Sequence, residues 1–396
     1  MQKFLTRYVK GLTEIMDRLC IYVIYDAENV IDEYVTYMLK QLRTYCTKLV
    51  VVCNTGFDRS GEKIDSLADQ VIYRENIGYD AGGYKDALCR YIGWDRLYMY
   101  DELLLLNDSF YGPIYPMQQV FDRMAAIETD YWGLTRSQEC LTVKDRHYKG
   151  HIQSYFMVFR KNVINNSIFK KFWEQLAYPE KMDEAIEYFE LGINRCLEEE
   201  GFQSIAISDF YQDMIKFKEN ENPYLRYPLE LIRDCSIPIL KYKSLTFGNE
   251  GYANALKAYQ FIEENCLYDV MYIKNHFWRK SKYEEGMIDL EKLEKFYENH
   301  RRVYIYGYGV YGKNFGLYFQ YRKWKIEGFL VTAAKEGEEA VPFEEAEMER
   351  EDGLVVAVGK KVLCGEILAY LEDKCERDQL MFPNYGLGFK GKRNEK

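Results

Sequence analysis

The feature that most constrains the fold is a pair of short apolar runs separated by a helical pattern. Residues 20–25 and 48–53 are almost continuously apolar, and between them apolar side chains recur at three- and four-residue intervals from Val30 to Leu42. A strand, a helix and a second strand in this order predict parallel strands joined by a right-handed crossover. Because neither run alternates with polar residues, we expect a sheet covered by helices on both faces. The chain is therefore predicted to be an α/β protein with a mostly parallel sheet.

The alternation of strands and helices continues beyond this start and then begins a second time. Apolar runs at 71–73 and 103–106 predict further strands, and a new strand at 302–306 is followed by a glycine-rich loop and a later strand at 354–358. A chain of 396 residues is long enough for at least two domains. We predict a first domain at 1–278, a helical connector at 279–300, a small Rossmann-like α/β domain of about four strands at 301–385 and a basic tail at 386–396.

The charge and the cysteine pattern exclude several classes of function. The formal net charge of −10 opposes attraction to nucleic acid, so no nucleic-acid partner is expected. The ten cysteines include no C-x-x-C pair and the four histidines show no ligand spacing, which argues against structural zinc and indicates a reducing compartment. No apolar stretch approaches the roughly 20 residues that span a bilayer. We therefore expect a cytoplasmic protein, with at most a peripheral membrane contact through its basic tail.

Polar side chains follow four successive strands of the predicted first domain. In an open parallel sheet, ligands collect beyond the carboxyl ends of the strands. Each polar loop alone could be a helix cap or an Asx turn, but the set predicts a binding site at one edge of the sheet. Its members are Asp26, Asn54, Asn76 with Asp80, and Asn107 with Asp108.

Asp108 is the strongest candidate for a metal ligand in this set. It follows a run of four leucines and Asn107, so its carboxylate is expected to be held rigidly at the sheet edge. Mg²⁺ or Mn²⁺ bound there would neutralise a nucleotide diphosphate, with Asn107 and Ser109 contributing neutral oxygens. Gly78, just before Asp80, would let the backbone approach a phosphate near the start of a helix. The alternative is an Asx turn that merely ends the strand.

Four blocks of sequence resemble the rhamnan synthesis F family of rhamnosyltransferases. They are Glu75-Asn-Ile-Gly-Tyr-Asp80, Leu106-Asn-Asp-Ser-Phe-Tyr-Gly-Pro113, Tyr131-Trp-Gly-Leu-Thr135 and His151-Ile-Gln-Ser-Tyr-Phe156. With weaker blocks, the likeness covers about residues 20–276. The order of strands, the Asn-x-Gly loop and the DxD-like triplet also look like a GT-A glycosyltransferase. Asn107 stands where many GT-A enzymes carry the first aspartate of the triplet, which lowers the metal affinity expected of this site.

The resemblance implies a glycosyltransferase that binds a nucleotide-sugar donor. It would move a sugar, rhamnose from dTDP-rhamnose, onto a lipid-linked surface polysaccharide with inversion. The loops at the sheet edge would hold the donor and a Mg²⁺ or Mn²⁺ ion. His151 and Gln153, in the fourth block, are candidates for donor contact, although a lone histidine is more often structural.

Inverting transfer also needs a carboxylate to accept the proton of the acceptor hydroxyl. In related GT-A enzymes this base lies on a late acidic motif that opens a helix, and Glu187 and Glu190 occupy the corresponding region. Their three-residue spacing would place both carboxylates on one face of a helix. Glu190 is the first candidate and Glu187 the second. The alternative is that both are solvated charges on an acidic helix.

The loop after the strand at 302–306 carries Gly307, Gly309 and Gly312 in the strand–loop–helix setting of a dinucleotide-binding fingerprint. That fingerprint also needs an acidic residue about 20 positions further on. The next predicted strand, at 326–331, ends instead in Thr332. These glycines are therefore weak candidates for nucleotide binding, and NAD is not expected as a cofactor.

Two other classes of function remain open at this point. A nucleotide-sugar oxidoreductase or epimerase would work at the Gly307–Gly312 loop and would bind NAD tightly. A non-catalytic scaffold of a polysaccharide-synthesis complex would keep the transferase fold but would tolerate the loss of Asp108.

Overall fold

The computed structural model describes residues 16–54, 62–138, 141–143, 146–148, 150–218 and 220–387. The chain divides into two compact units, Met1–Pro223 and Tyr224–Lys396. This division falls earlier than the boundary at 278 proposed from the sequence, and the domain limits given there stay predictions. The basic residues of the predicted tail at 386–396 lie outside the described residues, as does the whole of 388–396.

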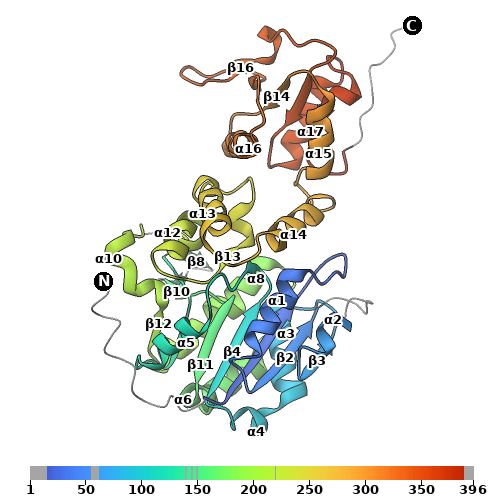
Figure 1. Cartoon of the computed structure of the whole chain (residues 1–396). Coiled ribbons are helices and arrows are strands. Elements are labelled where there is room, and N and C mark those ends of the chain that lie inside the picture. The colour runs from blue at the N-terminus through green and yellow to red at the C-terminus, as the bar shows by residue number, and fades with distance from the viewer. Residues whose placement is uncertain are drawn as a thin grey trace. The chain divides into compact units, whose positions relative to one another are not determined.

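The first unit is built on a seven-stranded sheet with the order β12-β6-β11-β4-β1-β2-β3 (Figure 1). Its strands are β1 (Arg18–Ile24), β2 (Lys48–Cys53), β3 (Gln70–Tyr73), β4 (Glu102–Asn107), β6 (Tyr131–Gly133), β11 (Phe156–Arg160) and β12 (Ser204–Ala206). Neighbouring strands are parallel except where β11 runs antiparallel to both β4 and β6. The predicted α/β fold with a mostly parallel sheet is therefore confirmed.

Helices and short strands surround this sheet. The helices are α1 (Glu33–Leu42), α2 (Glu62–Asp65), α3 (Tyr79–Asp86), α4 (Trp94–Leu97), α5 (Gln118–Ala125), α6 (Lys161–Ile164), α7 (Ser167–Gln175), α8 (Met182–Ala185), α9 (Gly192–Glu199) and α10 (Gln212–Ile215), with α11 (Pro223–Arg226) at the division between the units. Two segments, Ala87–Ile92 and Ile186–Leu191, are π-helical and continue α3 and α8. Short strands are β5 (Phe110–Tyr111), β7 (Arg136–Ser137), β8 (Leu141–Val143), β9 (Arg146–Tyr148) and β10 (His151–Ile152).

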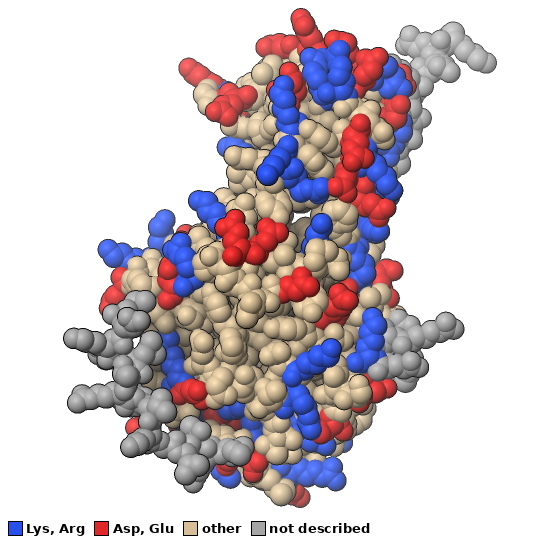
Figure 2. Space-filling view, in the orientation of Figure 1, with Lys and Arg blue, Asp and Glu red and all other residues tan. Residues whose placement is uncertain are grey.

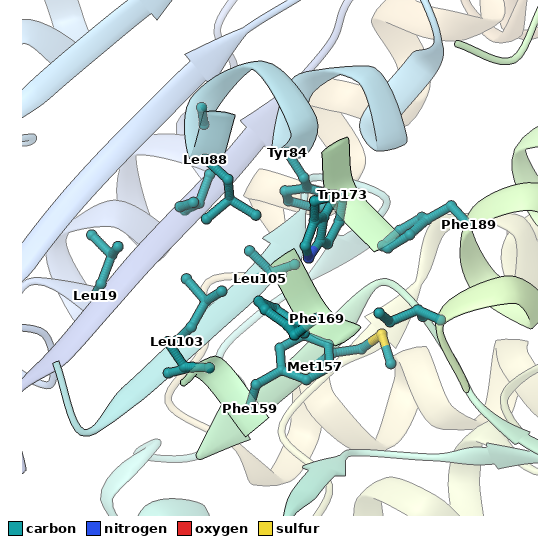
Figure 3. Packing of buried hydrophobic residues seen from close by; sticks show 14 of the residues in the cluster. Leu19, Tyr84, Leu88, Leu103, Leu105, Met157, Phe159, Phe169, Trp173 and Phe189 are labelled. Atoms are coloured by element: carbon teal, nitrogen blue, oxygen red, sulfur yellow. The ribbon is translucent and has the colours of Figure 1, made fainter. Parts of the chain in front are cut away.

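The central strands of this sheet are buried on both faces. Every residue of β1 and β4 is buried, and successive side chains of a strand point to opposite faces. On one face Leu103 and Leu105 pack with Trp173 of α7 and with aromatic residues of the flanking helices (Figure 3). On the other face Phe121 of α5 packs edge-on against Trp132, with 5.9 Å between the ring centroids. Continuous apolar runs are what a sheet covered on both faces requires.

The second unit contains a five-stranded sheet in which all neighbouring strands are parallel, one strand more than predicted. The strand order is β16-β15-β14-β17-β18. The strands are β14 (Val303–Tyr306), β15 (Gly328–Val331), β16 (Val341–Pro342), β17 (Gly353–Val356) and β18 (Leu380–Met381), with β13 (Leu240–Lys241) earlier in the chain. The helices are α12 (Pro228–Arg233), α13 (Tyr252–Asn265), α14 (Met271–Ser281), α15 (Leu290–Asn299), α16 (Val310–Tyr321) and α17 (Lys361–Leu371).

Two apolar clusters cover the two faces of this second sheet. Ile305 of β14 belongs to a cluster with Phe315 of α16, whereas Tyr306 belongs to another with Leu368 of α17. The first cluster also includes Leu290 of α15, so part of the predicted connector at 279–300 packs in the core of this unit. On the visible face of the second unit, basic and acidic side chains are interspersed (Figure 2). No helix within the described residues is both long enough and apolar enough to cross a bilayer.

Candidate active site

An open cleft of about 780 Å³ lies at the carboxyl edge of the first sheet. Loops that follow β1, β3 and β4 line it, together with the segment before β11 and the end of α8 with the π-helical segment after it. The polar residues in its lining include Tyr25, Asn76, Asp80, Asp108, Ser154, Tyr178, Glu180 and Glu190. Because parallel strands present their carboxyl ends at one edge, residues far apart in the sequence meet here. Asp80 and Asp108 therefore share one cleft.

Hydrogen bonds hold both of these aspartates in place. Oδ2 of Asp108 accepts a hydrogen bond from the backbone N–H of Tyr25 at 2.9 Å. The backbone carbonyl of Asp108 accepts another from the Tyr34 hydroxyl at 3.0 Å. Oδ2 of Asp80 accepts from the side-chain amide of Asn107 at 2.6 Å. The triplet at the end of β4 is thus tied directly to Asp80 in the first turn of α3.

The amide oxygen of Asn107 is engaged within the triplet itself. It accepts hydrogen bonds from the backbone N–H of Ser109, at 3.2 Å, and from the Ser109 hydroxyl. Asn107 is 6% exposed, and neither it nor Ser109 is among the residues that line the cleft. These contacts give both residues a part in positioning Asp80 and Asp108.

The loop that leads into α3, directly before Asp80, has an unusual backbone conformation. Gly78 has φ +79°, and a Cβ there would lie 2.9 Å from Cδ1 of Tyr178. Tyr79 also has a positive φ, 54°. Positive φ favours glycine, and Gly78 lets α3 begin directly at the cleft. Within α3, a Cβ on Gly82 would lie 2.1 Å from the carbonyl oxygen of Ile77, so the loop also packs tightly on its own helix.

Arg74 holds the loop between β3 and α3 in place. Its guanidinium donates to Oδ1 of Asn54 at 2.6 Å, to Oδ2 of Asp86 at 2.8 Å and to the backbone carbonyl of Ile77 at 2.6 Å. The Arg74 and Asp86 side chains are only 9% and 8% exposed. Asn54 in turn donates to the carbonyl of Tyr79 at 3.1 Å. Asn54 therefore stabilises the backbone at the start of α3 and is not among the residues that line the cleft.

Asn76 differs from the other strand-end residues because part of it is unsatisfied. It lines the cleft, and its side-chain oxygen is buried without a hydrogen-bond partner among the described residues. A buried acceptor without a partner destabilises a protein by about 1–3 kcal/mol. A ligand that donates a hydrogen bond to this oxygen would remove that penalty.

Glu190 reaches the cleft from the opposite side, and its carboxylate is held by two neighbours. Oε1 lies 2.8 Å from Nε2 of His151. Oε2 accepts hydrogen bonds from the backbone N–H of Ser154, at 2.8 Å, and from the Ser154 hydroxyl. Asn194, one turn further on, donates to the backbone carbonyl of Glu190 at 2.8 Å and also bonds both backbone polar groups of Ile152. The carboxylate is thus locked to the strand β10 and the turn before β11.

These contacts change the acidity of Glu190. Burial alone raises the pKa of this carboxyl, because it disfavours the charged form. The hydrogen bond and the charge of His151, with the two hydrogen bonds from Ser154, outweigh burial. The net result is a pKa below the ordinary glutamate value, so Glu190 is ionised at neutral pH.

Glu187 does not share the cleft with Glu190. It lines a different depression, with Lys171 and Arg195. The expectation that both carboxylates lie on one helix face assumed an α-helix, but Ile186–Leu191 is π-helical. A π-helix has more residues per turn, so a three-residue step covers a smaller part of the turn and the two side chains diverge.

The remaining residues predicted from the sequence lie beside the cleft. Oδ1 of Asp26 accepts from the backbone N–H groups of Glu28 and Val30, at 3.0 and 3.1 Å, which is the turn-forming role weighed as the alternative. Gln153 is buried and its side-chain oxygen accepts from the Thr135 hydroxyl at 2.6 Å. His151 is 4% exposed and reaches the cleft through Glu190. None of these three is among the residues that line the cleft.

Two residues that organise the site were not predicted. Ser154 belongs to the fourth family-like block, which was its signal, but its bond to Glu190 depends on the fold. Arg74 directly follows β3, and a cation at the carboxyl end of a strand could have been noted beside Asn76 and Asp80.

In the second unit, two of the three predicted glycines are needed for close packing. Gly307 has φ +117°, and a Cβ there would lie 2.8 Å from the Ala357 carbonyl oxygen. A Cβ on Gly312 would lie 2.0 Å from the Gly307 carbonyl oxygen, whereas a Cβ on Gly309 would meet no atom within 4 Å. Thr332, after β15, shares a hydrogen bond with the Tyr306 hydroxyl at 2.6 Å.

The sequence matches the family described as Rhamnan synthesis protein F over residues 49–308. This match spans more than half of the 396 residues and includes Asp80, Asp108 and Glu190. The chain belongs to this family.

Two curated proteins are similar to this chain at 26% and 30% identity. Uncharacterized protein y4gN of Sinorhizobium fredii is 26% identical over 249 residues, which cover 62% of this chain and 61% of that protein. Virulence protein VirA of Vibrio anguillarum is 30% identical over 220 residues, which cover 48% of this chain and 66% of that protein. The chain thus spans less than two thirds of the length of either relative.

Similar solved structures have low scores. S. aureus TarS in complex with UDP has a TM-score of 0.30 at 15% identity, covering 50% of this chain and 63% of that one. Core-mannan synthase A from Aspergillus fumigatus, in its Mn/GDP form, has a TM-score of 0.25 at 9% identity, covering 46% and 72%. 4-Diphosphocytidyl-2C-methyl-D-erythritol synthase has a TM-score of 0.31 at 9% identity, covering 48% and 89%. Scores this low carry no argument about the function of this chain.

Proposed function

We propose that the chain is a GT-A-like glycosyltransferase that moves a sugar from a nucleotide-sugar donor onto a surface polysaccharide. By the family likeness the donor is dTDP-rhamnose, the acceptor is a lipid-linked glycan and the transfer inverts the anomeric centre. Such an acceptor would place the protein in the cytoplasm at the inner face of the membrane. The observation that carries the proposal is the shared cleft, in which Asp80, Asp108 and Glu190 line one open space at the carboxyl edge of a parallel sheet.

The donor would lie along the Asp80 and Asp108 side of this cleft. Carboxylate oxygens are the ligands that Mg²⁺ and Mn²⁺ prefer, so these two aspartates fit an ion of this kind. When bound, the ion supplies positive charge to the departing diphosphate. Asn107 keeps Asp80 beside the β4 triplet. The buried oxygen of Asn76, which has no partner among the described residues, would accept a hydrogen bond from the nucleotide sugar. The loop at Gly78 lets the backbone come close to the phosphates.

Glu190 would act as the base on the other side. The acceptor hydroxyl loses its proton to the Glu190 carboxylate as its oxygen bonds to the anomeric carbon, and the nucleotide diphosphate leaves from the opposite face. A base has to be ionised before it can accept a proton, and the contacts with His151 and Ser154 keep the pKa of Glu190 low. A carboxylate has about four acceptor positions, so these contacts leave room for the acceptor hydroxyl. Glu187, which lines another depression, is assigned no catalytic role.

The second unit would be a small Rossmann-like accessory domain without redox chemistry. Its strand order corresponds to the first five strands of a doubly wound sheet. The position after β15, where a dinucleotide site carries the acidic residue that holds the ribose, is taken by Thr332. Gly307 and Gly312 are explained by packing against neighbouring backbone. The oxidoreductase alternative therefore gains no support from these residues, and the scaffold alternative is tested by Asp108→Ala.

A donor screen tests the proposed function. Purified protein is incubated with dTDP-, UDP- and GDP-sugars, with and without Mg²⁺ or Mn²⁺, and release of the nucleoside diphosphate is measured. We expect release of dTDP from dTDP-rhamnose that depends on the ion and is lost in Asp108→Ala. Glu190→Gln is expected to abolish transfer to an acceptor while donor binding persists. Equal turnover in wild type and Asp108→Ala, or a change in the redox state of added NAD, would contradict the proposal.

A further inference from the structure

The second unit contains a pocket that the proposed transfer does not use. It has a volume of about 220 Å³ and lies among α13, α14 and α16, with all of its lining residues in this unit. Six aromatic side chains contribute to its walls: Tyr252, Tyr259, Phe277, Trp278, Tyr318 and Tyr321. Three charged side chains also line it: Glu263, Lys274 and Arg322. An aromatic pocket with a few charged groups is a typical binding site for a small ligand.

One wall of the pocket carries two tyrosine hydroxyls and a carboxylate. Tyr259, Tyr321 and Glu263 all line the pocket. Burial and the negative charge of Glu263 raise the pKa of both tyrosine hydroxyls, which stay protonated and able to donate hydrogen bonds. The two tyrosine rings meet edge to face, with centroids 5.9 Å apart. This wall therefore offers hydrogen-bonding groups next to ring surface.

Cationic groups stand elsewhere in the lining. Arg322 is ion-paired with Glu294, donates to the Tyr318 hydroxyl at 3.0 Å and lies 4.3 Å over the Trp324 ring. These three contacts fix the direction of the guanidinium. The ammonium of Lys274 lies 5.1 Å from the centre of the Trp278 ring. The pocket thus combines apolar ring faces with both donors and acceptors of hydrogen bonds.

This combination selects among ligand classes. An isoprenoid chain would bury Glu263 and the tyrosine hydroxyls against hydrocarbon, at a cost in free energy. A nucleotide would bring its phosphates toward Glu263 and toward an arginine already neutralised by Glu294, and about 220 Å³ is less than pockets for larger ligands usually offer. A pyranose ring has apolar C–H faces, which pack on aromatic rings, and hydroxyls around its edge, which match the polar groups.

We propose that this pocket binds one sugar unit of a glycan, so that the second unit holds the polysaccharide while the first unit carries out transfer. The glycan assignment rests on the proposed function, since polysaccharide is the substrate there. The site itself is separate from the cleft of Asp108, and its residues belong to helices that the transfer mechanism does not use.

The test is a binding titration with a short rhamnose oligosaccharide, followed by tryptophan fluorescence because Trp278 lines the pocket. Tyr321→Phe removes a hydroxyl from the pocket wall, and Tyr259→Ala removes a ring from it. We expect each variant to bind the oligosaccharide about tenfold more weakly than wild type. Tyr370→Phe is the matched control, because it removes a tyrosine–glutamate hydrogen bond of 2.6 Å, to Glu344, at a site outside the pocket. Thermal melting checks that each variant is folded.

Two further arms separate this proposal from the proposed function. Asp108→Ala is expected to bind the oligosaccharide as wild type does, even though it loses dTDP release. If the donor screen fails but the protein binds the glycan in a way that depends on Tyr321, the proposed transferase function is wrong and the pocket assignment stands. The pocket assignment is overturned if wild type binds no oligosaccharide, or if Tyr321→Phe and Tyr259→Ala bind it as wild type does. It is also overturned if these variants lose affinity for farnesyl phosphate, an isoprenoid probe, and not for the oligosaccharide.

Discussion

Replacing Arg74 by methionine should destabilise the first unit far more than replacing an exposed arginine in the same unit. Arg74 pairs with Asp86, and the two side chains are 9% and 8% exposed. Removing one partner of a buried ion pair leaves the other charge buried and costs about 3–5 kcal/mol. Asp86 keeps one hydrogen bond from the Tyr178 hydroxyl, at 2.6 Å, and an ion pair with Arg90, at 3.2 Å. We therefore expect a loss near the lower end of this range, about 3 kcal/mol.

Arg43→Met is the matched control for this prediction. Arg43 pairs with Asp69, but these side chains are 46% and 24% exposed. An exposed ion pair contributes about 0–1 kcal/mol. Urea unfolding of the three proteins would measure the difference. Arg74→Met should also weaken donor binding, because the carbonyl of Ile77 and the side chain of Asn54 lose their anchor. Equal destabilisation by the two variants would refute the account of a buried anchor beneath the cleft.

Two further predictions concern single groups. His151 helps to hold the pKa of Glu190 below its ordinary value of 4.5, whereas burial raises it. His151→Gln should therefore raise the pKa of Glu190 and move the acid limb of the kcat/KM profile to higher pH. An acid limb at the same pH in His151→Gln would exclude this role of His151. The stability that the ionised Glu190 carboxylate contributes should be lost as pH falls through the pKa of Glu190 in the folded protein. Gly312→Ala should destabilise the second unit by about 1–3 kcal/mol, because its Cβ would meet the Gly307 carbonyl, whereas Gly328→Ala, which has no neighbour within 4 Å, should be near neutral. Equal melting temperatures for the two alanine variants would refute the packing argument.

The strands of the first sheet could be predicted because their residues are apolar without alternation. The predicted strand at 48–53 coincides with β2, and the four-leucine run lies inside β4. The position of β11 could not be predicted in the same way. It runs antiparallel between β4 and β6, and a short apolar run contains no information about its direction or its neighbours.

The second sheet shows a different limit. β14 and β17 are four-residue apolar strands and were found in the sequence. β16 and β18 have two residues each, which is too short for any periodic signal. Neither strand was located from the sequence, and the expected number of about four strands was one too few, although the parallel arrangement itself followed from the strand–helix alternation.

The candidate site was predictable where backbone direction alone decides the outcome. Asp80 and Asp108 follow strands of one parallel sheet, so their meeting at one edge follows from topology. The partners of Glu190 depend instead on side-chain packing, since His151 and Ser154 precede it by 39 and 36 residues. The separation of Glu187 from Glu190 depends on a π-helical segment, for which the sequence contains no recognised signal.

The central claim is that Asp108 belongs to a cleft that holds a nucleoside diphosphate. Calorimetric titration of the protein with dTDP in the presence of Mg²⁺ tests it most directly. Asp108→Ala is compared with Asp95→Ala, which removes an exposed carboxylate from α4 in the same unit. We predict that dTDP binds wild type and Asp95→Ala alike and binds Asp108→Ala at least about tenfold more weakly. Equal affinity of all three proteins for dTDP would contradict the account.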